Sequence, residues 1–150
     1  MDRARCRRPY GAIGARIPRL TPDSPVVLRL AGYLSERFPP AAYGLLVGVF
    51  FGSAVSVAMA PGVGVVPARA WAGGAVMWLA FLHLRVFDEH RDAESELSAS
   101  PDRLLSRGVV TLPLLAWMGA IALVGEASLS AWIGPRALAA WVAVLLFTLL

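Results

Sequence analysis

Residues 41–60 read AAYGLLVGVFFGSAVSVAMA and contain no charged side chain. About 20 residues in an α-helix, at roughly 1.5 Å each, cover the hydrocarbon core of a lipid bilayer. An uncharged run of this length therefore predicts a membrane-spanning helix. This prediction indicates that the protein is an integral membrane protein.

Three more apolar segments follow, which raises the predicted number of spans to about four. Residues 70–87 are uncharged until Arg85, which lies close enough to the end of the segment to reach the lipid headgroups. Residues 108–125 form the third segment, and residues 137–150 form the fourth. The predicted fold is an all-α, polytopic transmembrane helical bundle. Because the fourth segment has no polar flank, we expect the 150 residues to be the N-terminal part of a longer membrane protein or a truncated gene product.

The composition supports the same class. Apolar residues make up 57% of the chain and charged residues 16%, whereas soluble domains have about 45–50% and about 25%. This hydrophobic surplus disfavours a water-soluble helical domain. The single cysteine, Cys6, excludes an intrachain disulfide and a multi-cysteine metal site.

All 14 basic residues are arginine, and their distribution predicts the orientation in the membrane. With the N-terminus in the cytoplasm, the opposite side receives only Arg69 and Arg136. The cytoplasmic side receives twelve: the eight that precede residue 40, together with Arg85, Arg91, Arg103 and Arg107. This asymmetry predicts a plasma-membrane or inner-membrane protein with a cytoplasmic N-terminus. The arginines lie beside apolar runs with few interleaved aromatic residues, so no nucleic-acid partner is expected.

Two regions follow from this organisation: a basic cytoplasmic arm over residues 1–38, and a transmembrane region over residues 39–150 with an acidic cytoplasmic loop at 88–107. Residues 25–38 of the arm predict an interfacial helix. Its expected apolar side holds Val26, Val27, Leu30, Tyr33 and Leu34, and its expected polar side holds Arg29, Glu36 and Arg37. A disordered basic tail that touches anionic lipid is the alternative interpretation.

Small residues recur at every fourth position of the first span, at Gly44, Gly48, Gly52, Ser56 and Ala60. Such a face lets another helix approach closely. We expect packing within the bundle, with a dimer interface as the alternative. In the third segment, Pro113 is expected either to kink the helix or to mark its first turn.

The acidic loop contains the residues best suited to bind a ligand. Asp88 and Asp92 are four residues apart, so on a continuing helix their carboxylates share one face, and Glu96 follows at the next turn as an accessory ligand. Carboxylates that repel one another favour a hard divalent cation, and Mg²⁺ is the first candidate because it completes its coordination with water and substrate phosphate. Arg91, Arg103 and Arg107 supply donors suited to phosphate oxygens.

A simpler interpretation is that this loop is a solvated connection with ion pairs on a helix surface. The i,i+4 spacing of Arg85 and Glu89 fits that interpretation. The two histidines, His83 and His90, lie seven residues apart and are too distant to act as a pair. Each is expected to be a hydrogen-bonded packing residue rather than a metal ligand.

Residues 81–112, FLHLRVFDEHRDAESELSASPDRLLSRGVVTL, resemble the first conserved region of the UbiA superfamily of intramembrane prenyltransferases. The family pattern is Asn-Asp-x-x-Asp-x-x-x-Asp, followed by a stretch similar to RPLPSGRIS. Asp88 and Asp92 fall on the last two aspartates, and Arg103, Arg107 and Gly108 fall on the second stretch. The family's leading Asn and Asp are replaced by Leu84 and Arg85.

The resemblance implies a reaction and a larger bundle. Mg²⁺ held by Asp88 and Asp92 would bind the diphosphate of an isoprenoid donor, and arginines would stabilise that diphosphate as it leaves. The prenyl group would pass to an acceptor, commonly an aromatic ring. Family members have about nine spans and a second aspartate-rich motif, whereas Glu126 is the only acid after Asp102.

A later segment or a partner chain would therefore supply the rest of such a site. The alternative is a non-catalytic integral membrane protein whose cytoplasmic loop binds a cation or a lipid headgroup.

Overall fold

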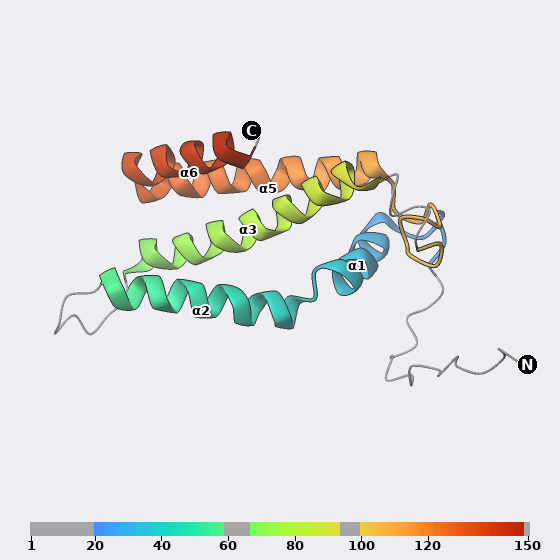
Figure 1. The fold of residues 1–150 in the computed structure, drawn as a ribbon, viewed down its shortest axis with the longest axis horizontal. Coiled ribbons are helices and arrows are strands. Elements are labelled where there is room, and N and C mark those ends of the chain that lie inside the picture. The colour runs from blue at the N-terminus through green and yellow to red at the C-terminus, as the bar shows by residue number, and fades with distance from the viewer. Residues whose placement is uncertain (1–19, 59–66, 94–99, 149–150) are drawn as a thin grey trace, which may run out of the picture.

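A computed structural model describes residues 20–58, 67–93 and 100–148 (Figure 1). These residues form helices and turns and contain no strand, which confirms the all-helical prediction. The helices are α1 (Val26–Arg37), α2 (Pro40–Ala58), α3 (Ala68–Arg91), α5 (Leu112–Ile133) and α6 (Pro135–Thr148).

Three of these helices, α2, α3 and α5, are long and apolar enough to cross a membrane. The fourth predicted span forms α6, which has 14 residues and so extends about 21 Å. That length is shorter than the roughly 30 Å of a bilayer core. Over the described residues, the structure therefore supports three candidate spans and one shorter apolar helix.

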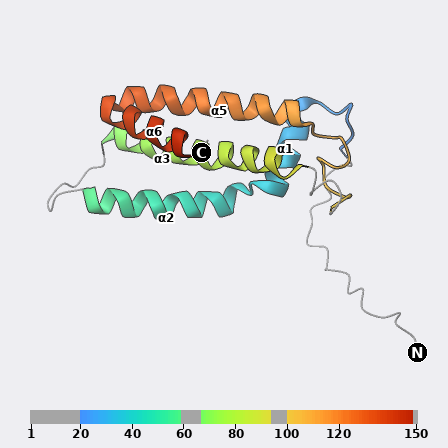
Figure 2. The ribbon, with the colours of Figure 1, turned by 45° about the horizontal axis from the view of Figure 1, so that its top comes forward.

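The three long helices lie side by side, with α3 between α2 and α5 (Figures 1 and 2). After α5, the chain reverses at Gly134, whose φ of 146° is accessible to glycine and strained for other residues. Helix α6 then runs back along α5 (Figure 2). Helix α1 lies where α3 ends and α5 begins, and we call this the α1 end of the bundle (Figure 1).

The buried core is small and lies at the α1 end. It contains Tyr33, Val86, Val110 and Leu115, which come from α1, α3, α5 and the turn that precedes α5. Along the long helices, large apolar side chains point outward instead, including Val57, which is 88% exposed. Outward apolar side chains suit helices that are surrounded by lipid.

Residues Val26–Arg37 form helix α1, so the predicted helix is present, while its location at the membrane surface stays a prediction. On the expected apolar side, Tyr33 is buried and Val26 and Val27 are exposed. The expected polar side is wrong for one residue. Arg37, assigned to the polar side, instead packs against α3, where its guanidinium meets the carboxylate of Glu89. A charged side chain can leave the water when such a partner is available.

The predicted packing role of the small residues on α2 is wrong for two of them. A Cβ atom added to Gly44 would meet Trp78, but one added at Gly48 or Gly52 would meet nothing within 4 Å. A glycine of α3 also lets α2 and α3 approach closely, because the ring of Phe51 from α2 lies over Gly74 of α3. Pro113 lies in the first turn of α5, which confirms the second of its two expected roles.

Candidate functional site

Helix α3 carries the predicted metal-binding aspartates. Asp88 lies in its last turn, and Asp92 is its C-cap, where the Asp92 backbone N–H donates to the Asp88 carbonyl at 2.9 Å. The helical continuation needed to align the two residues is therefore present. The predicted loop at 88–107 consequently begins later, because its first four residues belong to α3.

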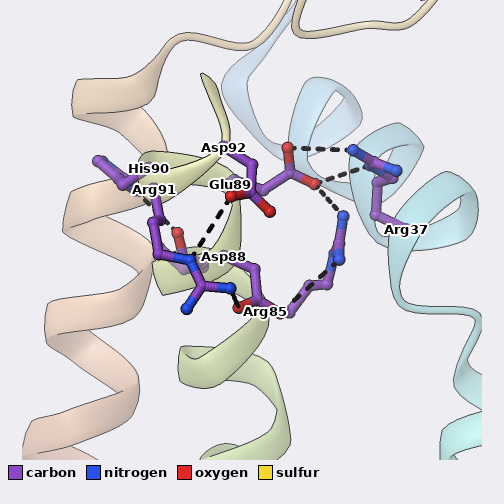
Figure 3. Close-up of polar contacts among 8 residues, drawn as sticks. Arg37, Arg85, Asp88, Glu89, His90, Arg91 and Asp92 are labelled. Carbon is purple, nitrogen blue, oxygen red and sulfur yellow. Dashed lines mark hydrogen bonds and ion pairs between the residues drawn. The ribbon is translucent and has the colours of Figure 1, made fainter. Parts of the chain in front are cut away.

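The two carboxylates flank one cationic side chain (Figure 3). Arg91 Nη2 lies 3.9 Å from Asp88 Oδ1, and Arg91 Nε lies 3.5 Å from Asp92 Oδ1. The aspartate side chains are about half exposed, and that of Arg91 is 78% exposed. The pair is thus open to solvent; Arg91 lies beside both carboxylates, and Arg85 Nη1 also lies 4.0 Å from Asp88 Oδ2.

The donor set suits a metal that brings other ligands with it. No group of three or more His, Cys, Asp or Glu residues that could hold a metal occurs in the described ranges, and Glu96 lies outside them. Two carboxylates do not form an all-protein cage. They do fit Mg²⁺, which usually keeps several waters and accepts phosphate oxygens from a substrate.

The other predicted phosphate ligands lie in the turn segment before α5. Arg107 Nη2 donates to the Leu20 carbonyl at 3.1 Å, so this side chain holds the segment that precedes α1. Arg103 is half-buried in the same turn, where its carbonyl accepts the Arg107 backbone N–H at 2.9 Å. The structure thus brings Arg91 to the aspartate pair and gives Arg107 a different partner.

Sequence reasoning missed the importance of Glu89, which it treated as half of a surface ion pair. Its side chain is fully buried, and its Oε1 lies 2.7 Å from Arg37 Nε and 2.6 Å from Arg85 Nη2 (Figure 3). Arg37 Nη2 also donates to Oε2 at 3.2 Å. Two guanidinium groups compensate the buried carboxylate and fix α1 to α3. The i,i+4 spacing of Arg85 and Glu89 was the available signal.

Tyr33 borders this cluster. Its hydroxyl lies near the Arg85 guanidinium, but within the described residues it makes no hydrogen bond of good geometry. Burial raises the pKa of the Tyr33 phenol above its ordinary value, and the nearby Glu89 carboxylate raises it further. Arg85 and Arg37 oppose this shift more weakly. The phenol consequently stays protonated over the physiological range.

A second buried polar group joins three helices. His83 Nδ1 lies 2.5 Å from Glu126 Oε1, and Trp141 Nε1 donates to Glu126 Oε2 at 2.9 Å. The side chain of His83 is 5% exposed and that of Glu126 is 0%. The predicted hydrogen-bonded role of His83 is confirmed, but its carboxylate partner on α5 was not foreseen. His90 Nδ1 lies 2.8 Å from the Val86 carbonyl of its own helix.

Comparison of the chain with family models, curated proteins and solved structures gives no match.

Proposed function

We propose that this chain forms part of a UbiA-like intramembrane prenyltransferase, in which Asp88 and Asp92 bind Mg²⁺ together with the diphosphate of an isoprenoid donor. The observation that supports this proposal most directly is the placement of the pair. Both carboxylates lie at the end of a candidate membrane span, both are half exposed, and both flank the single guanidinium of Arg91.

The aspartates and the arginines would have different roles in this reaction. Asp88 and Asp92 would hold the cation, because an anionic side chain can bind an anionic substrate only through a positive ion. When bound, Mg²⁺ would neutralise charge on the departing diphosphate. Arg91, which is mostly exposed, would turn from the carboxylates toward phosphate oxygens, with Arg103 and Arg107 as further donors.

The remaining parts of the proposal follow from the sequence. The arginine asymmetry favours a cytoplasmic N-terminus and a site at the cytoplasmic face of the plasma or inner membrane. The isoprenoid chain would lie among the helices, and the acceptor would receive the prenyl group. A later segment or a partner chain would supply the second acidic motif.

The test measures the affinity of the purified protein for farnesyl diphosphate with and without Mg²⁺ in lipid nanodiscs. Wild type is expected to bind only with Mg²⁺, and an Asp88→Asn/Asp92→Asn variant is expected to lose that dependence. Asp102→Asn is the matched control, because Asp102 is an exposed aspartate in the turn before α5. Unchanged Mg²⁺-dependent binding in the double variant contradicts the proposal.

One observation favours a second candidate, a non-catalytic membrane protein that binds a cation or a lipid headgroup at the same loop. Arg85 stands where the family has an aspartate, and its guanidinium is committed to Glu89 at 2.6 Å. Position 85 therefore carries a positively charged side chain where the family has a metal-binding carboxylate. Mg²⁺-dependent binding of inorganic diphosphate without prenyl transfer to 4-hydroxybenzoate, or to any aromatic acceptor tested, would support this candidate.

A further inference from the structure

The buried polar group of His83, Glu126 and Trp141 borders two apolar cavities. A cavity of about 310 Å³ lies between α3, α5 and α6, and His83, Glu126 and Trp141 are among its lining residues. A second cavity of about 290 Å³ continues between α3 and α5. His83 is the one residue in the lining of both, so its side chain borders each cavity.

These cavities have the size and character of a small-molecule site. Ligand pockets are typically about 300–1,000 Å³, mostly apolar, with a few polar groups that orient the ligand. Besides His83, Glu126 and Trp141, only Ser130 and Thr148 add polar side chains to the first cavity. His90 adds a polar side chain to the second cavity, so any selectivity for a polar atom must come from these few groups.

The pairing of His83 determines what its other ring nitrogen offers. Burial among apolar side chains disfavours a net charge on the His83–Glu126 pair. Two arrangements are neutral: an imidazolium beside a carboxylate, or a neutral imidazole beside a protonated carboxyl group. In both, one hydrogen lies between Nδ1 and Oε1, and we infer that Nε2 carries the other ring hydrogen.

That second hydrogen has no acceptor in the part of the chain that the structure describes. His83 Nε2 is buried and unpartnered, whereas both oxygens of Glu126 are engaged by His83 and Trp141. A buried donor without a partner is costly, and an acceptor that enters the cavity would remove that cost.

We propose that the His83–Glu126 pair forms a binding site for an apolar, membrane-soluble molecule that carries a carbonyl oxygen. The carbonyl accepts the hydrogen bond from His83 Nε2, and the apolar remainder occupies the cavities on either side of His83. Glu126 is the positioning residue, because it fixes the ring and keeps the hydrogen on Nε2. This site is separate from Asp88 and Asp92 and does not depend on prenyl transfer.

Benzophenone is a suitable probe, because it is an apolar diaryl ketone that also crosslinks under ultraviolet light. The excited ketone takes a hydrogen atom from a nearby C–H bond, and the two resulting carbon radicals couple. In the nanodisc-bound protein, crosslinks are expected on lining residues such as Leu84, Val144 and Leu145. The infrared carbonyl band of the bound probe should lie at lower frequency than in lipid alone.

Three variants test the hydrogen bond. His83→Phe removes the donor, so about tenfold weaker labelling and loss of the infrared shift are expected. His83→Phe/Glu126→Gln should behave alike, and it avoids a buried unpaired carboxylate if the single variant folds poorly. Glu126→Gln should keep both signals. Its amide oxygen can accept from Trp141 while its amide N–H donates to His83 Nδ1, and Nε2 then retains its hydrogen.

The outcomes separate this site from the proposed enzyme. Labelling and infrared shift that persist in both His83→Phe variants would overturn the proposal, as would crosslinks spread evenly over the lipid-facing helices. Asp88→Asn/Asp92→Asn should leave both signals unchanged. Failure of Mg²⁺-dependent diphosphate binding therefore leaves the carbonyl site standing, and loss of the carbonyl site leaves the diphosphate proposal standing.

Discussion

Glu89 is a fully buried carboxylate in contact with two guanidinium groups from different helices. Such a cluster contributes little net stability compared with apolar packing, yet removing one charge leaves the others buried and uncompensated. This asymmetry makes Glu89 the most sensitive charged position at the α1 end. Its neighbours Arg37 and Arg85 cannot lose their charge by titration, since arginine stays protonated.

Glu89→Gln is expected to lower the free energy of unfolding by roughly 3 kcal/mol, because two partly buried guanidiniums lose their shared buried carboxylate and Arg85 keeps only Asp88, at 4.0 Å, as an ion-pair partner within the described residues. Glu36→Gln is the matched control, because Glu36 is exposed and, among the described residues, contacts only the Leu104 N–H at 3.5 Å. Its change in the free energy of unfolding should stay within about 0.5 kcal/mol. Chemical unfolding in detergent measures both. Equal effects of the two variants would contradict the buried ion pair.

Tyr33 makes stability depend on alkaline pH. Its pKa in the folded protein is raised by burial and by Glu89, so folding favours the protonated phenol. The stabilisation is complete below the ordinary phenol pKa of about 10 and is lost as pH rises further. The chain has no lysine that would titrate in the same range. Wild-type Tm should therefore fall above about pH 10, and Tyr33→Phe should reduce that fall. Identical pH profiles would show that the Tyr33 phenol is not buried beside Glu89.

Among the described helices, α3 and α5 have the most extensive contact. Glycine residues of α5 allow the two helices to lie close together. A Cβ atom at Gly119 would lie 3.1 Å from Cγ1 of Val86, a buried β-branched side chain that cannot easily move. A Cβ at Gly125 would also lie 3.1 Å from its neighbour, but that atom is the flexible end of Leu79. The same distance thus has different consequences at the two positions.

Gly119→Ala is expected to destabilise the protein by about 1–3 kcal/mol through overpacking. Gly125→Ala should cost less, and Gly48→Ala should be neutral or stabilising, because it meets nothing within 4 Å and alanine favours a helix. Unfolding of the three variants in detergent gives the order. A ranking in which Gly48→Ala is the most damaging would mean that α2 packs through its small residues after all.

The elements also show how far the sequence alone could lead. Uncharged length predicted α2, α3 and α5, because crossing a bilayer is a requirement on composition and length that each segment meets by itself. The continuation of α3 through Asp88 was not predicted, because the loop was expected to begin at residue 88; it was only the condition under which Asp88 and Asp92 share one face. The i,i+4 pair of Arg85 and Glu89 could be read from the spacing, but the contacts of Glu89 with Arg37 and of His83 with Glu126 could not, because each joins residues from different helices. Residue spacing within one helix carries no information about such partners.

At the scale of the whole molecule, the orientation in the membrane remains a prediction from the arginine distribution. Cys6 is the only cysteine and lies in the basic arm, so it can report the side on which the arm lies. A membrane-impermeant maleimide should label Cys6 in inside-out vesicles and leave it unlabelled in intact cells. Labelling in intact cells would place the arm outside and would remove the cytoplasmic site.

The central claim is that Asp88 and Asp92 jointly hold a divalent cation together with a diphosphate. Electron paramagnetic resonance of Mn²⁺, used in place of Mg²⁺, measures metal bound to the nanodisc-embedded protein directly. With farnesyl diphosphate present, we expect bound Mn²⁺ in wild type and in Asp102→Asn, and its loss in Asp88→Asn/Asp92→Asn. Equal Mn²⁺ binding in wild type and the double variant would contradict the account.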